Sequence, residues 1–296
     1  MRTRFASWAL LVFFAGCLSG AAQADDSALF WALNKDGEHA GFLLVTIHSE
    51  DPRVLDFPEA FIQQMNANRY FAMEMVPDLP TLARLTTYMH YQDGTRLEDV
   101  IGSDRFAQLN SLLGGYKIPP ESLRQMKVWA VMMTLSVPPP KSGFFMDLSL
   151  SLRAAGAGLK VVGLETLEEQ LSFLEDMPLD QQLQLLDHAL LEYGRVVEVH
   201  DEMVDVYLQG DLGVLERMAE EQMQSLDVEA RDYFIEQGII ARNERMVQTL
   251  LPYLAEDSVF IAVGALHLPG EKGLVSLLEK NGYRLEALPS PFSAPE

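Results

Sequence analysis

Apolar and polar positions near the start of the chain are arranged as in a β-hairpin. Two apolar runs, residues 29–33 and 41–47, flank the dipeptide Asp36-Gly37. Asp and Gly tolerate the positive φ of a tight turn, so this pair between two strand-like runs predicts a two-stranded hairpin. A short helix is expected over residues 58–67, before a third strand-like run at 69–75.

The end of the chain predicts a strand, a helix and a strand in succession. Residues 259–263 and 283–288 are strand-like, and residues 273–281 between them have helical spacing. One more strand is expected at residues 159–164, where it ends in the sequence GLET. These elements indicate the α/β class, with a mixed β-sheet flanked by helices.

The middle of the chain has helical spacing over residues 81–135 and again over 167–251. Apolar residues that step by four and three predict a stripe buried against a neighbour: Leu179, Leu183, Leu186, Leu190, Tyr193 and Val197. Between the two stretches, prolines at 138–140 force an extended connector. We expect a single domain of residues 25–296 with a large helical insertion at about residues 79–250.

The first residues have the pattern of a secretory signal peptide at 1–24. A basic start at residues 1–4 precedes an apolar stretch at 8–18, and Ala22-Gln23-Ala24 provides a small-residue cleavage site. The chain is therefore expected in the periplasm or outside the cell; a lipoprotein anchored through Cys17 is the alternative. Because Cys17 is the only cysteine, any metal in the mature chain must be held by His, Asp, Glu and water.

The charge of the chain limits its partners. A formal net charge of −21 disfavours binding to nucleic acid and to anionic lipid surfaces. After the leader, no apolar stretch is long enough to cross a membrane, so no integral membrane segment is expected. The sequence leaves the oligomeric state open.

Two histidines and a glutamate are the main candidates for chemistry. His48 ends the run FLLVTIH and His267 ends VFIAVGALH, so each is expected at the end of a buried strand, where open α/β sheets build their sites. Glu74 lies in the apolar run RYFAMEM, where a charge is costly unless it is paired or bound to a cation. These three side chains could hold a divalent metal or perform acid/base chemistry, and a salt bridge with Arg242 is the structural alternative for Glu74.

Arg242 and Asn243 are unusual for their helix, because both fall on its apolar face. Buried Arg and Asn side chains need partners. They could cap a carboxylate, orient a ligand or stabilise an oxyanion, or they could form a purely structural network. Among the other histidines, His39, His90 and His188 are expected to face solvent, and His200 to be hydrogen-bonded in a core or an interface.

Several motifs together resemble the TraB/GumN family, which is related to the Tiki proteases. They are LFWAL with LLVTIH, FAMEM, MDLSLSLRAAGAGLKVVGLETLEEQLSFLEDMP, IIARNERM and FIAVGALHLPGEKGLVSLLEKNGY, in the order and approximate spacing of the family. The resemblance implies a fold shared with ChaN-like and erythromycin-esterase-like proteins, and metal-dependent peptide hydrolysis through two Gly-x-x-His motifs and a glutamate. The second motif is intact at 264–267, but the first, at 45–48, has Val45 in place of Gly.

The resemblance and the residues together favour a periplasmic metal-dependent hydrolase of peptides or another envelope substrate. His48, Glu74 and His267 are expected to surround Mn or Co, or Zn, with Glu74 as ligand or general base. Arg242 or Asn243 is expected to steady the oxyanion. Two alternatives stay open: a non-catalytic protein that binds a peptide, haem or polysaccharide, which Val45 favours, and hydrolysis by histidine and carboxylate without metal.

Overall fold

Six strands form one mixed sheet in the order β4-β3-β5-β2-β1-β6. The computed structural model describes residues 28–224 and 226–292, so the predicted signal peptide lies outside the described residues. Strand β1 is antiparallel to β2 and β6, whereas β2, β5, β3 and β4 run parallel. The strands are β1 (Phe30–Lys35), β2 (Glu38–Thr46), β3 (Tyr70–Met73), β4 (Lys160–Gly163), β5 (Val259–Gly264) and β6 (Arg284–Leu288). The predicted mixed α/β sheet is confirmed.

The hairpin of β1 and β2 turns where the sequence predicts it. Asp36 and Gly37 both have positive φ, at 53° and 85°, as a tight turn between two strands requires. Further along β2, Gly41 lies so close to β5 that a Cβ atom would be 2.0 Å from the carbonyl oxygen of Val259. Glycine at 41 therefore lets the hairpin join the parallel part of the sheet.

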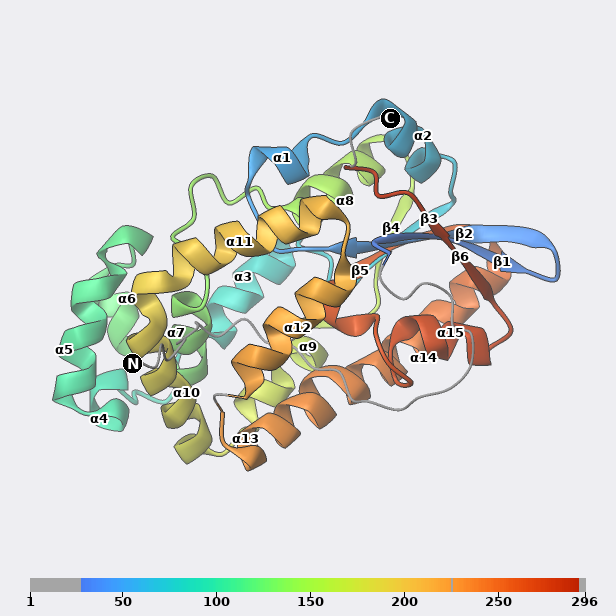
Figure 1. The fold of residues 1–296 in the computed structure, drawn as a ribbon. Helices are drawn as coiled ribbons and strands as arrows, with labels where there is room; N and C mark the ends of the chain where they lie inside the picture. The colour runs from blue at the N-terminus through green and yellow to red at the C-terminus, as the bar shows by residue number, and fades with distance from the viewer. Residues whose placement is uncertain (1–27, 225, 293–296) are drawn as a thin grey trace, which may run out of the picture.

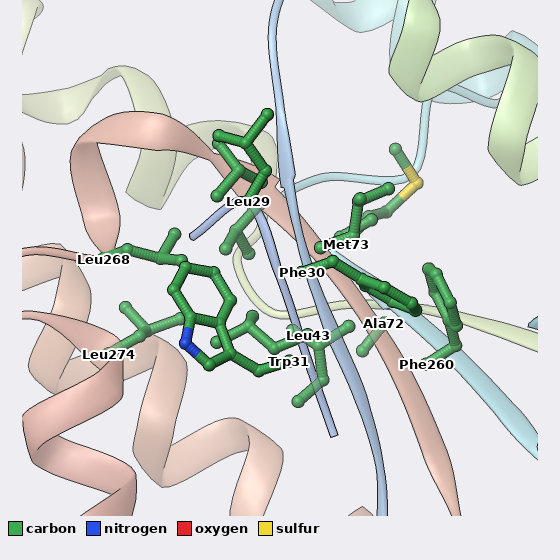
Figure 2. Packing of buried hydrophobic residues seen from close by; sticks show 14 of the residues in the cluster. Leu29, Phe30, Trp31, Leu43, Ala72, Met73, Phe260, Leu268 and Leu274 are labelled. Atoms are coloured by element: carbon green, nitrogen blue, oxygen red, sulfur yellow. The ribbon is translucent and has the colours of Figure 1, made fainter. Parts of the chain in front are cut away.

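Helices cover both faces of the sheet. On one face lie α1 (Pro52–Leu55), α2 (Glu59–Asn66) and α8 (Met146–Gly156), and on the other α14 (Ala241–Glu256) and α15 (Leu274–Lys280) (Figure 1). Between them is an apolar core, which we call the sheet cluster, with Trp31, Phe71 and Phe260 fully buried in it. Figure 2 shows Trp31 from β1 next to Leu268 and Leu274, which follow β5.

The helical insertion has an apolar core of its own, which we call the helical cluster; it includes Leu109, Trp129, Leu174 and Ile235. The remaining helices are α3 (Leu79–Tyr88), α4 (Leu97–Ile101), α5 (Ser103–Leu112), α6 (Pro120–Gln125), α7 (Val128–Leu135), α9 (Leu167–Glu175), α10 (Leu179–Glu192), α11 (Val196–Gln209), α12 (Leu212–Met223) and α13 (Val228–Tyr233). Short 3₁₀ turns cover Leu113–Tyr116, Tyr193–Arg195 and Ala265–His267, and a π-helical segment covers Phe234–Ile240. No helix in the described part of the chain is long and apolar enough to span a membrane.

The apolar stripe predicted to be buried from Leu179 to Val197 is exposed at both ends, so the prediction is wrong there. Leu179 and Val197 are 49% and 51% exposed, while Leu186 and Leu190 are buried as predicted. Helix α10 ends at Glu192, and the 3₁₀ turn that follows has fewer residues per turn than an α-helix. This change of phase turns Val197 outward, and the buried face of α11 begins at Val196 instead.

The parallel strands all end at one edge of the sheet, and this edge positions the candidate site. Thr46 at the end of β2 pairs with Gly264 at the end of β5, and Met73 in β3 pairs with Ala262. Residues that follow β2, β3, β4 and β5 therefore emerge close together. Much of the helical insertion extends beyond this edge (Figure 1).

Candidate active site at the carboxyl edge of the sheet

Glu74 follows β3 directly, and its carboxylate accepts three hydrogen bonds. Oε1 accepts from the backbone N–H of Gly264 at 2.8 Å, and Oε2 accepts from Arg242 Nη2 at 2.8 Å and Gln170 Nε2 at 3.0 Å. A Cβ atom on residue 264 would lie 3.0 Å from Glu74 Oε1. The glycine of the intact Gly-x-x-His motif thus admits the carboxylate against the backbone of β5.

His267 lies at the end of the 3₁₀ turn after β5 and is 3% exposed. Its Nδ1 is 2.6 Å from Asn243 Oδ1, and Asn243 Nδ2 donates to the carbonyl oxygen of Lys272 at 2.8 Å. Because the amide of Asn243 turns its oxygen to the ring, the neutral imidazole carries its proton on Nδ1. The Nε2 atom keeps its lone pair, 3.7 Å from Glu74 Oε2.

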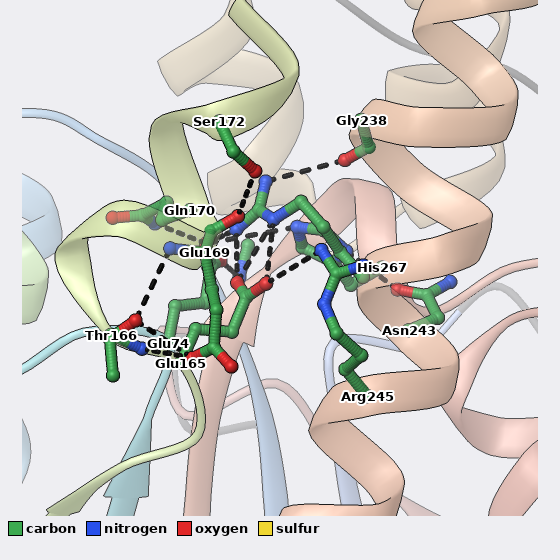
Figure 3. Close-up of polar contacts among 12 residues, drawn as sticks. Glu74, Glu165, Thr166, Glu169, Gln170, Ser172, Gly238, Asn243, Arg245 and His267 are labelled. Atoms are coloured by element: carbon green, nitrogen blue, oxygen red, sulfur yellow. Dashed lines mark hydrogen bonds and ion pairs between the residues drawn. The ribbon is translucent and has the colours of Figure 1, made fainter. Parts of the chain in front are cut away.

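Arg242 joins Glu74 to a second carboxylate, Glu165, whose side chain is fully buried. Arg242 Nε and Nη2 donate to Glu165 Oε2 at 2.9 Å and 2.7 Å, and Nη1 donates to the carbonyl oxygen of Gly238 at 3.3 Å. Arg245 Nη2 is 3.7 Å from Glu165 Oε1. Figure 3 shows Glu74 and Glu165 beside His267, with Asn243 and Arg245 on the helix that faces them.

The π-helical segment immediately before Arg242 contributes to this arrangement. The backbone N–H of Ala241 donates to the backbone carbonyl oxygen of Glu236, five residues earlier, so the segment has wider turns than an α-helix. Gly238 lies in it, and a Cβ atom there would be 3.0 Å from the rings of both Phe173 and Phe234. The helix thus approaches α9 closely while the Gly238 carbonyl bonds the Arg242 guanidinium.

Electrostatics separate the protonation states of Glu74 and His267. Burial opposes ionisation of Glu74, but His267, which is protonated at the acid pH where Glu74 titrates, together with the Arg242 guanidinium and the Gly264 N–H, outweighs it and lowers the pKa of Glu74 to about 2. Burial lowers the pKa of His267 to about 4, although the Glu74 charge acts in the other direction. At neutral pH the pair therefore consists of a carboxylate and a neutral imidazole. Burial raises the pKa of Glu165 against the effect of Arg242.

His48 lies apart from this pair, although β2 delivers it to the same edge. Its side chain is 64% exposed, its ring lies against the ring of Phe145 at a tilt of 35° with centroids 3.8 Å apart, and its Nδ1 is 3.7 Å from Asp147 Oδ2. The structure thus brings Glu74, Arg242, Asn243 and His267 together and leaves His48 in a neighbouring cluster.

Glu74 and His267 supply two of the donor atoms that a divalent metal needs. Glu74 Oε2 and His267 Nε2 face each other without a proton between them, and two such donors repel unless a cation or a water hydrogen lies between them. Asn243 behind His267 is the kind of partner that orients a ligating imidazole. These two residues fit a metal ion, but within residues 28–224 and 226–292 no three His, Cys, Asp or Glu side chains are grouped to hold one.

Two contacts of Glu74 and Arg242 were missed from the sequence. Glu165 is the glutamate of GLET, two residues after the end of β4, and the strand-end rule that selected His48 and His267 applies to it equally. Gln170 on α9 carries no sequence signal of its own.

Val45, which replaces glycine in the first motif, is fully buried in the sheet cluster, and its carbonyl oxygen accepts a hydrogen bond from Tyr207 at 2.8 Å.

The remaining histidines follow the sequence only in part. His39 is exposed as expected, whereas His90 and His188 are half-buried and face solvent only in part. His90 bonds Ser122 Oγ at 2.9 Å, because the turn after α3 packs against α6. His200 has a 14% exposed side chain, and burial lowers its pKa.

The lowered pKa of His267 predicts that acid weakens the fold. Below pH 6.5 the unfolded chain binds a proton at this residue, whereas the folded chain does so only near its pKa of about 4. The free energy of unfolding should therefore fall by up to about 3 kcal/mol as the pH drops through this window. Urea unfolding of wild type and His267→Gln at several pH values measures the difference. The lowered pKa of His200 affects stability equally in both proteins. Parallel curves of unfolding free energy against pH above pH 4.5 would therefore contradict the prediction.

Comparisons with known proteins find one matching family model and several similar proteins. The model of the TraB/PrgY/gumN family matches residues 29–287. Metalloprotease TIKI1 of Danio rerio is 24% identical over 93% of this chain and 66% of its own length. Metalloprotease TIKI2 of Xenopus tropicalis is 24% identical over 91% of this chain and 61% of its own length. Metalloprotease TIKI1 of Homo sapiens is 23% identical over 93% of this chain and 65% of its own length. The chain thus spans about two thirds or less of these relatives, and no solved structure matches it.

Proposed function

Because the chain belongs to the TraB/PrgY/gumN family, we propose that it is a Tiki-like, metal-dependent hydrolase of peptides. The observation that carries the proposal is the pair of Glu74 Oε2 and His267 Nε2, two unprotonated donors 3.7 Å apart at the carboxyl edge of the sheet. A secreted or periplasmic location follows from the signal peptide expected at residues 1–24.

His267 and Glu74 would hold the metal, and His48, from the adjacent strand end, is the candidate third ligand. Mn or Co suits this set of nitrogen and oxygen donors, and Zn is a further candidate. When bound, such an ion polarises a scissile carbonyl and lowers the pKa of a bound water.

The residues around the pair keep it ready for hydrolysis. Arg242, Gln170 and the Gly264 N–H hold the Glu74 carboxylate in place and ionised, so it can bind a cation or accept a proton from water. Asn243 holds the proton of His267 on Nδ1, which leaves Nε2 free to act. Arg242 and Asn243 direct their side chains to these protein groups, so we assign them positioning roles.

A second function is a non-catalytic protein that binds a peptide, haem or an envelope polysaccharide at the same edge. The separation of His48 from Glu74 and His267 favours it, as does Val45 in the first motif. In both functions the same edge is the binding site.

Metal binding and peptide cleavage distinguish the two functions. Purified chain from Asp25 onward is titrated with Mn²⁺, Co²⁺ and Zn²⁺ in a calorimeter and then incubated with a peptide library, with and without a chelator. The hydrolase should bind one of these ions and cleave only when it is present, and His48→Ala with His267→Ala should abolish binding. His39→Ala, at the exposed hairpin turn, is the control and should change neither.

Three outcomes contradict the proposal in different ways. Retention of bound metal after both replacements would place the metal elsewhere. Ligand binding without peptide cleavage in the presence of any of the three ions would favour the non-catalytic binding protein. Turnover that withstands the chelator would favour hydrolysis by histidine and carboxylate alone.

A further inference from the structure

The position of His48 is set by a second segment that runs antiparallel to its own. We call the pair of segments 46–50 and 141–147 the clasp. At one end, Glu50 Oε2 accepts from the backbone N–H groups of Lys141 and Ser142 at 3.0 Å and 2.7 Å, and Oε1 accepts from Gly143 at 2.8 Å. Gly143 has a φ of +79°, which helps the three N–H groups converge on the carboxylate.

The middle of the clasp holds the ring of His48. The backbone N–H of Met146 donates to the carbonyl oxygen of Ser49 at 3.1 Å, which joins the two segments beside the ring. Phe145 then lies against the imidazole, with ring centroids 3.8 Å apart. His48 is thus placed by residues almost a hundred positions later in the chain.

Asp147 closes the other end of the clasp and is the nearest carboxylate to His48. Thr46 Oγ1 donates to Asp147 Oδ1 at 2.7 Å, which fixes the carboxylate and turns Oδ2 toward His48 Nδ1, 3.7 Å away. The Asp147 side chain is 19% exposed, so its charge is less screened by water than a surface charge. A carboxylate beside Nδ1 favours the tautomer with the proton on that nitrogen and leaves the lone pair on Nε2.

The clasp also connects His48 with the Glu74 and His267 pair. Thr46, which fixes Asp147, is the sheet neighbour of Gly264, whose N–H fixes Glu74. The two clusters therefore share one rigid part of the sheet, where β2 and β5 pair. His267 and His48 have corresponding partners: Asn243 Oδ1 at Nδ1 of the first, and Asp147 Oδ2 at Nδ1 of the second.

We propose that Asp147 is a positioning residue for His48, which it orients and holds in the Nδ1–H tautomer with Nε2 available to a metal or substrate. The inference rests on the proposed function for the use of Nε2, but the orientation of the ring is measurable without metal or substrate. Partners of this kind on a ligating imidazole are worth about 10- to 100-fold in metal affinity or activity.

Nitrogen chemical shifts of the imidazoles measure the tautomer directly. Metal-free protein labelled with ¹⁵N at histidine is recorded at roughly pH 8.5, where a free imidazole is neutral; His48→Gln assigns the His48 signals. In wild type His48 should be protonated on Nδ1, and in Asp147→Asn the population should move to Nε2–H, because the Asn amide can donate to Nδ1. Asp187→Asn removes a carboxylate that pairs with Arg105 on the surface and is the matched control.

A second variant covers the case that Asp147→Asn does not fold. Thr46→Val keeps the shape of the side chain but releases Asp147, and should shift the tautomer in the same direction. An unchanged His48 tautomer in whichever of these variants folds overturns the proposal. A shift together with a 10- to 100-fold lower kcat/KM supports it fully; a shift in a protein that binds no metal and cleaves no peptide supports the positioning role and contradicts the proposed function.

Discussion

Replacing Glu74 by glutamine is expected to lower kcat/KM for peptide cleavage by roughly 10²- to 10⁴-fold, the range for loss of a general base. Glutamine has the shape of glutamate and can still accept from the Gly264 N–H, so the fold should persist. The charge that binds a cation or accepts a proton from water is lost, whereas Arg242 keeps Glu165 as its partner. Activity is measured with the best peptide from the library, and metal affinity by calorimetry.

A matched control for this variant is Glu168→Gln, which removes a carboxylate that pairs with Arg84 on the exposed side of α9. It should leave kcat/KM within about twofold of wild type, because surface ion pairs contribute little. Activity of Glu74→Gln near the wild-type level, in a protein with unchanged circular dichroism, would show that the reacting groups lie elsewhere.

Replacing Arg242 by methionine is expected to destabilise the fold by about 3–5 kcal/mol at neutral pH, because it removes the cation between two buried carboxylates. Glu165 is fully buried and Glu74 is largely buried, so neither can recover its lost partner from bulk water. The penalty should shrink as the pH falls and the carboxylates take up protons. Urea unfolding at neutral pH and at about pH 5 measures both effects.

Two further proteins test the cause of this loss. Arg105→Met, which breaks the exposed pair with Asp187, should cost less than about 1 kcal/mol. Adding Glu165→Gln to Arg242→Met removes a buried charge that keeps only Arg245, 3.7 Å away, and should recover part of the stability. If the double variant is less stable than Arg242→Met, packing of the arginine stem and not charge would be responsible.

The elements of the sheet and one half of the site could be predicted from the sequence for simple physical reasons. Parallel strands end at one edge, so Glu74 and His267 converge even though they are far apart in the chain. Arg242 and Asn243 interrupt an apolar helix face, which required buried partners, and the structure supplies a carboxylate and an imidazole. The same strand-end rule would have found Glu165.

Other features had no local signal. The direction of the His48 side chain depends on Phe145 and Asp147, which belong to a distant segment, so the run FLLVTIH contains no information about it. Ile235 and Ile239, both buried in the π-helical segment at 234–240, are four residues apart as in an α-helix, so their spacing does not reveal the wider turns. The 3₁₀ turn after α10 contains Gly194, which weakens a helix, but a single glycine does not show that the next helix begins in a different phase.

The two apolar clusters meet at the candidate site, and they supply different parts of it. Glu74, Glu165 and His267 follow strands of the sheet cluster, whereas Gln170 lies on α9, whose Phe173 and Leu174 belong to the helical cluster. The candidate site residues are thus attached to the sheet, and α9 brings the helical cluster into contact with Glu74 through Gln170. On the proposed function, the helical insertion can be altered while the sheet residues are kept, which makes it the natural part to redesign for a new specificity.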